Sequence, residues 1–125
     1  MKKRTLGILA TFIAIIGFMS MTTAIGEFKF ENETHDFGTI PQNKPASYNF
    51  KFSNTGDAPI IINEVKPSCG CSVAEFTKTP VKPGEGGTVT VTYNAAATGP
   101  FTKQFTIKSN TKTPIKTLTI KGNVE

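Results

Sequence analysis

Apolar and polar residues alternate with a period of two along most of the chain after residue 26. Tyr48, Phe50 and Phe52, for example, are separated by Asn49 and Lys51. Because successive side chains of a β-strand point to opposite faces, such runs predict strands with one buried and one solvated face. The polar positions are rich in threonine, which suits the solvated face of a sheet. The pattern predicts strands at residues 28–31 together with 35–37, 46–53, 59–66, 71–76, 88–94, 101–109 and 115–121.

Turn-forming residues separate these runs. None of the eight prolines falls inside an alternating run, as expected because proline lacks the N–H that a strand interior needs. Turn sequences rich in Gly, Asn and Pro stand at residues 54–57, 82–87 and 98–100. Short strands at this regular spacing predict an all-β protein, a seven-stranded antiparallel β-sandwich of the immunoglobulin-like type. No helix is expected after residue 24.

The N-terminal segment has the pattern of an export signal. A basic run at residues 1–4 precedes an apolar run at residues 6–19, and small and polar residues follow up to Ala24. This order is typical of a helical secretory signal peptide, here residues 1–24, with cleavage after Ala24. The alternative is an uncleaved anchor, because the uncharged stretch is just long enough to span a bilayer. In both cases residues 25–125 form the sandwich domain and are exported to the periplasm or the cell surface.

Composition and charge limit the choice of partner. The chain of 125 residues has a net charge of +5, but three of its 14 basic residues lie in the first four positions. Without those three, 11 basic residues oppose 9 acidic ones, a net charge of +2. Because the lysines are scattered singly, no nucleic-acid partner is expected. Contact with a membrane is expected only through the N-terminal segment, if it is not cleaved.

Both cysteines of the chain lie in the sequence Ser68-Cys69-Gly70-Cys71. Thiols tend to oxidise in exported proteins. In an extended strand, Cα atoms two residues apart are about 6.6 Å apart, close to the ~6.8 Å limit for a disulfide. Gly70 can adopt backbone angles that bring the pair closer, with Ser68 and Gly70 forming the supporting turn. Such a short loop adds little stability through chain entropy, so stabilisation alone is a weak reason for the pair.

Three interpretations of the cysteine pair remain open. The two residues form a structural turn, packed or disulfide-bonded; or they form a redox or thiol-exchange site; or they bind a soft metal ion such as Cu(I), which paired thiolates favour. The chain after residue 24 has a single histidine, His35, and no methionine, which limits a metal site. We therefore predict no metal and no cofactor.

His35 lies three residues before a predicted loop at residues 38–45. In a sandwich, this loop, the cysteine turn and the loop at residues 95–99 should meet at one end, which His35 approaches. A lone histidine on a strand is more often a surface or hydrogen-bonded residue than a ligand or a base. No combination of nucleophile, base and orienting group is recognisable around it. We therefore predict no catalytic residues and no enzyme activity.

Five short motifs occur in a familiar order: Phe-Gly-Thr-Ile at residues 37–40, then segments at 50–59, 68–71, 80–85 and 120–122. Together they resemble the bacterial domain of unknown function 1573, which is common in Bacteroidetes. The resemblance covers residues 28–124. It implies export and a sandwich related to the Hydin and major-sperm-protein domains. It implies no activity, and the cysteines carry over only as part of a Cys-Gly-Cys signature.

The sequence thus favours a non-catalytic, exported binding or assembly module of the bacterial cell envelope. Its partner would be an unidentified envelope protein or glycan, bound at a sheet edge or at the loops of one end. The alternative is a thiol-redox or Cu(I)-binding protein that uses Cys69 and Cys71. A reactive thiol needs a cation or a helix N-terminus nearby; Lys66 is the nearest charge in the sequence, and no helix is expected.

Overall fold

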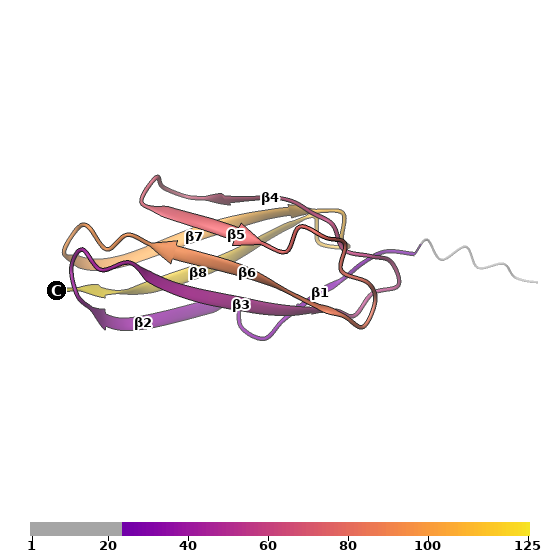
Figure 1. The fold of residues 1–125 in the computed structure, drawn as a ribbon, viewed down its shortest axis with the longest axis horizontal. Coiled ribbons are helices and arrows are strands. Elements are labelled where there is room, and N and C mark those ends of the chain that lie inside the picture. The colour runs from indigo at the N-terminus through magenta and orange to yellow at the C-terminus, as the bar shows by residue number, and fades with distance from the viewer. Residues whose placement is uncertain (1–23) are drawn as a thin grey trace, which may run out of the picture.

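The computed structural model describes residues 24–125, which form two β-sheets packed face to face (Figure 1). The predicted signal peptide lies outside the described residues except for Ala24. Residues 24–125 contain no helix, and so none that is long and apolar enough to cross a membrane. The strands are β1 (Phe28–Phe30), β2 (Thr34–Ile40), β3 (Ala46–Asn54), β4 (Ile62–Pro67), β5 (Ser72–Phe76), β6 (Gly86–Tyr93), β7 (Gly99–Ser109) and β8 (Ile115–Val124).

Each sheet has four strands. The first sheet has the order β1-β3-β6-β5, and the second has the order β2-β8-β7-β4. All neighbouring strands are antiparallel except β2 and β8, which are parallel. The prediction of an all-β sandwich is confirmed. The prediction of seven antiparallel strands is wrong, because there are eight strands and one parallel pair.

The extra strand comes from the region that was expected to form one strand, at residues 28–31 together with 35–37. Phe28 and Phe30 lie on β1 in the first sheet, whereas His35 and Phe37 lie on β2 in the second. The inward-facing residues change from even to odd numbers between these two segments. A strand keeps one parity on each face. The change in parity therefore marks the place where the chain crosses between the sheets.

The core lies between the two sheets and is built from the inward-facing residues of the alternating runs. Phe50 and Phe52 of β3 face Phe105 and Ile107 of β7 across the sandwich interior, and all four are buried. Burial of apolar surface stabilises the fold by about 25 cal/mol per Å². The buried apolar residues are Phe50, Phe52, Ile60, Ile62, Val81, Val89, Val91, Tyr93, Ala95, Phe101, Phe105, Ile107, Leu118, Ile120 and Val124.

Two glycines allow β2 and β8 to pack closely. Gly38 has a φ of 70° at an irregularity of the β2–β8 register, and its N–H donates to Asp36 Oδ1 at 2.8 Å. This left-handed conformation favours glycine. A Cβ on Gly122 would lie 2.8 Å from the Gly38 carbonyl oxygen, a distance too short for a side chain. The glycine of the first sequence motif is therefore favoured by its backbone conformation, and the glycine of the last motif by its close contact with the neighbouring strand.

A buried side chain closes the end of the sandwich where β3 finishes. Asn54 is 2% exposed, and its amide makes four hydrogen bonds. Its Oδ1 accepts from the N–H groups of Glu27 and Gly56, at 3.2 and 2.9 Å. Its Nδ2 donates to the carbonyls of Ala58 and Val81, at 2.8 and 2.9 Å. One side chain thus connects the segment before β1, the β3–β4 loop and the loop before β6.

Replacing Asn54 with alanine should lower the free energy of unfolding by about 3 kcal/mol, because four backbone groups lose a hydrogen bond to this buried side chain. Urea denaturation of both proteins measures the difference. Asn49→Ala is the matched control: Asn49 lies on the same strand, is exposed and accepts one hydrogen bond from Thr90. It should cost less than about 1 kcal/mol. Equal costs for the two variants would contradict the assigned role of Asn54.

Candidate functional site

The cysteine turn is the place where the chain passes from the second sheet to the first. β4 ends at Pro67 in the second sheet, and β5 begins at Ser72 in the first. Both are edge strands, and they lie along the same side of the sandwich (Figure 1). Residues 68–71 therefore cross between two neighbouring sheet edges, at the end of the molecule opposite Asn54.

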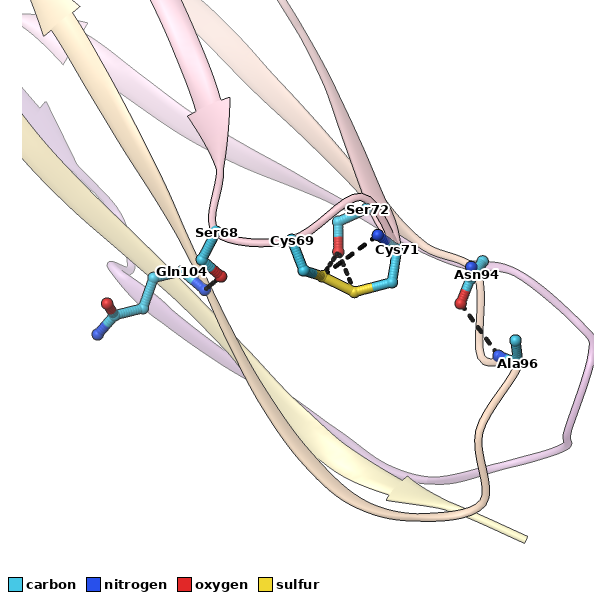
Figure 2. Close-up of a disulfide and its surroundings, with 7 residues drawn as sticks. All are labelled: Ser68, Cys69, Cys71, Ser72, Asn94, Ala96 and Gln104. Atoms are coloured by element: carbon cyan, nitrogen blue, oxygen red, sulfur yellow. Dashed lines mark hydrogen bonds between the residues drawn. A yellow bond between two sulfur atoms is a disulfide. The ribbon is translucent and has the colours of Figure 1, made fainter.

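Cys69 and Cys71 are joined by a disulfide within this crossing, with 5.2 Å between their Cα atoms (Figure 2). That distance lies inside the range that disulfides require. Of the structural interpretations, packed or joined, the structure shows the joined one. Gly70 is not among the glycines with positive φ, and a Cβ there would meet no atom within 4 Å. The pair is therefore closed without a left-handed conformation at Gly70.

Ser72, which the sequence analysis did not single out, lies against the disulfide. Its hydroxyl is 3.8 Å from both sulfur atoms (Figure 2). Because a bonded sulfur carries no proton, the hydroxyl is the donor. The N–H of Cys71 also donates to Cys69 Sγ, at 3.3 Å. Ser72 shares its parity with Ala74 and Phe76, the half-buried residues of β5, and that alternation is the sequence signal by which it could have been found.

Ser68 holds the other end of the turn in place. Its N–H donates to the Gln104 carbonyl at 2.8 Å, and its hydroxyl accepts from the Gln104 N–H at 3.1 Å. Ser68 thus extends the pairing of β4 with β7 by one residue. These bonds fix the start of the turn to the neighbouring strand β7.

Three loops meet around the cysteine turn, as the sequence predicted. The N–H of Asn94 donates to the Cys71 carbonyl at 2.9 Å, and the N–H of Asn43 donates to the Ala95 carbonyl at 2.8 Å. The loop after β2, the cysteine turn and the loop after β6 are therefore joined by backbone hydrogen bonds. Beside them is a shallow, mostly apolar pocket, which Cys71, Pro45 and Val73 help to line.

His35 packs between the sheets. Its ring stacks on Tyr48 with 3.7 Å between centroids and 9° between planes, and it meets Phe37 edge-on at 4.7 Å. Tyr48 belongs to β3 of the first sheet, so this pair covers one side of the core. His35 is half-buried and has a packing role; the structure does not bring it together with the cysteines.

The oxidised pair can do one kind of chemistry directly, thiol–disulfide exchange. Both sulfur atoms are bonded to each other, so neither is a thiolate ligand in this state. Within residues 24–125, no group of three or more His, Cys, Asp and Glu side chains is placed to hold a metal ion. Binding of Cu(I) by this pair would require reduction first.

β5, which begins at the disulfide, leaves one edge of the first sheet open. The N–H of Asn94 bonds to the Cys71 carbonyl, and the N–H of Thr77 bonds to the Thr88 carbonyl, so the odd-numbered residues of β5 face β6. Backbone groups alternate in direction along an antiparallel strand. Ala74 and Phe76 therefore direct their N–H and C=O groups away from the sheet, where no other segment of residues 24–125 pairs with them.

A family model described as "Protein of unknown function (DUF1573)" matches residues 28–124. No curated protein matches the sequence. The model match covers both sheets in full, including the cysteine turn and the open edge of β5.

Three solved structures illustrate the fold. A protein of unknown function from Porphyromonas gingivalis W83 is 16% identical with a TM-score of 0.71, covering 86% of this chain and 51% of that one. The PapD-like domain 7 of human CEP192 is 10% identical with a TM-score of 0.63, covering 99% and 98%. The secreted serine protease VesC from Vibrio cholerae is 16% identical with a TM-score of 0.59, covering 78% and 23%.

These likenesses show the fold alone, a PapD-like or immunoglobulin-like sandwich. The chain spans about half the length of the Porphyromonas gingivalis protein and about a quarter of the protease. The activity of the longer proteins therefore does not transfer with the fold.

Replacing both cysteines with serine should lower the free energy of unfolding by only about 1.5 kcal/mol, because the bond closes a loop of three residues. The flanking hydrogen bonds of Ser68 and Cys71 hold the turn without it. Chemical denaturation under non-reducing conditions measures the difference. A loss above about 3 kcal/mol would show that the disulfide is a main support of the fold.

Proposed function

The chain belongs to the DUF1573 family of proteins of unknown function, and we propose that it is a non-catalytic, exported binding or assembly module of the bacterial cell envelope. Its partner is an envelope protein that contributes an extended segment, which pairs with β5 as an added strand. The open edge of β5 is the observation that carries this proposal. Binding by strand addition is a general mode of peptide recognition.

Among the four sheet edges, β5 is the least protected. β1 has only three residues, and β2 is interrupted by the irregularity at Gly38. β4 ends in Pro67, has a shifted register near its start, and exposes Glu64 and Lys66. Proline, charge, irregular pairing and short length are the features by which proteins block an edge. β5 has five residues, no proline and one charge, Glu75.

The chemistry of the edge favours a polypeptide over the other predicted partner, a glycan. Ala74 and Phe76 offer backbone donors and acceptors at the spacing of a strand, which a second backbone matches. Val73 is 61% exposed on the outer face, next to the shallow pocket, and offers an apolar contact. Glu75 is exposed two residues further along the same face and favours a basic side chain on the partner.

Two features support export. The sequence of residues 1–24 has the order of a signal peptide. Disulfides such as Cys69–Cys71 form in oxidising compartments such as the periplasm and the cell surface.

The structural neighbours support a role beside other domains, because the fold covers only 23% of the secreted protease VesC.

A photo-reactive amino acid at Val73 should crosslink to an envelope protein in cells that produce the full chain. An added strand lies about 4.8 Å from β5, within reach of the probe. Ile115 is the matched control, because it is 55% exposed and lies on β8 of the other sheet. Mass spectrometry of the adducts should show a discrete partner from position 73 and none from position 115.

The same adduct should form when Cys69 and Cys71 are both serine, because the edge is built from the backbone of β5. Indiscriminate adducts from both positions, or loss of the adduct in the serine variant, would contradict strand addition at β5.

Ala74→Pro should abolish the Val73 adduct without unfolding the domain. Proline removes the N–H that faces outward and leaves the hydrogen bonds between β5 and β6 in place. Ala74→Ser is the matched control, since it keeps the N–H and nearly the same size. Adduct yield should fall at least about tenfold in the proline variant and stay unchanged in the serine variant. The thermal transition of each variant reports whether the domain is folded. Unchanged yield in a folded Ala74→Pro variant would refute pairing at this edge.

A further inference from the structure

We propose that the Cys69–Cys71 disulfide oxidises a protein dithiol by thiol–disulfide exchange. The thiolate of the partner attacks Cys71. The pair is half-buried at the end of the sandwich, and Cys71 lines the shallow pocket. The inference goes beyond strand binding and does not rest on it.

The fold holds the turn in place without the sulfur–sulfur bond. Ser68 is fixed to Gln104 by two hydrogen bonds, of which Figure 2 shows the one to the Ser68 hydroxyl. The Cys71 carbonyl accepts from the N–H of Asn94. The bond closes a loop of only three residues, so it restricts the unfolded chain little. A disulfide that is partly exposed and contributes little to the fold can open and close while the domain stays folded.

The surroundings of the two sulfur atoms are unequal. Cys69 Sγ accepts from the Cys71 N–H at 3.3 Å, whereas the Ser72 hydroxyl is 3.8 Å from both sulfur atoms and does not distinguish them. After reduction the Cys71 N–H favours a negative charge on Cys69, since a hydrogen bond to the charged form stabilises it. A stabilised thiolate is the better leaving group in an exchange reaction. Cys69 is therefore the leaving group, and attack falls on Cys71.

The exchange takes place in two steps. A thiolate of the partner attacks Cys71 Sγ, forms a mixed disulfide with it, and displaces Cys69 as a thiolate. The second thiol of the partner, deprotonated, then attacks its own sulfur in the mixed disulfide and displaces the Cys71 thiolate. The partner dithiol loses two electrons and two protons and becomes a disulfide. The Cys69–Cys71 pair gains the two electrons and ends as a dithiol, with its protonation set by the solvent.

Glutathione is the probe for the first test. The full chain is equilibrated with a series of reduced-to-oxidised glutathione ratios, then alkylated and weighed by mass spectrometry. We expect the pair to pass from oxidised to reduced within the range in which structural disulfides of secreted proteins stay oxidised. A pair that stays fully oxidised across the series, in folded protein, would overturn the proposal.

Ser72→Ala tests whether the Ser72 hydroxyl favours the reduced pair, and Ser68→Ala is its matched control. The two serines flank the disulfide, but only the Ser72 hydroxyl reaches the sulfur atoms. Ser72→Ala should shift the equilibrium about tenfold toward the disulfide, the size expected for one lost hydrogen bond to a charged group. Ser68→Ala should leave it unchanged. Equal shifts in the two variants would overturn the role of Ser72.

The trapped intermediate identifies the attacked sulfur. Rapid alkylation during reduction should find glutathione on Cys71 and the alkyl group on Cys69. Glutathione mainly on Cys69 would overturn the proposed direction of attack.

The double serine variant separates the two proposals, because it removes exchange completely and leaves the Val73 crosslink intact. If the chain with its cysteines intact exchanges normally with glutathione but gives no Val73 crosslink, only the strand-binding proposal is contradicted.

Discussion

The buried amide of Asn54 is the interaction on which one whole end of the sandwich depends. It bonds two N–H groups and two carbonyls from three separate segments, and it reinforces the backbone hydrogen bonds that also join these segments. A buried polar group stabilises only when its hydrogen bonds are complete, and this one is complete. The opposite end has no such connection. Its loops are joined by backbone hydrogen bonds, such as Asn43 to Ala95, and the half-buried disulfide lies beside them.

The position of the candidate site follows from the packing of the two sheets against each other through their apolar faces. Each sheet buries one face against the other, so the chain must pass between sheets at their ends. The passage from β4 to β5 takes only residues 68–71, because both strands are edges on the same side. This short crossing places the disulfide at a sheet end and makes β5 an edge strand. The reactive bond and the open edge therefore share one cause, the position of β5 in the order β1-β3-β6-β5.

The alternation of apolar and polar residues predicted most of the strands, because in a strand every second side chain faces inward. The buried residues of the core confirm these positions. The number of strands was missed at residues 28–37, where the inward parity changes and the chain changes sheet. The parallel pairing of β2 with β8 was missed because strand partners 84 or 85 residues apart leave no local signal. In the site, the three loops that meet were predicted from the sandwich topology. Ser72 was not singled out, although its contact with the sulfur atoms is local in the sequence. The stacking of His35 on Tyr48 was missed because it depends on a contact between the two sheets.

Strand binding and disulfide exchange use different groups of neighbouring residues, so one can assist the other without being required for it. The hydroxyl of Ser72 points to the sulfur atoms, while the backbone of Ala74 and Phe76 points out of the sheet. A segment paired with β5 runs alongside the strand toward Cys71 and the shallow pocket. Holding a thiol at that position raises its effective concentration near the disulfide, since the second encounter becomes intramolecular. An edge strand that begins at a disulfide thus joins recognition of an extended chain to a reaction with its thiols.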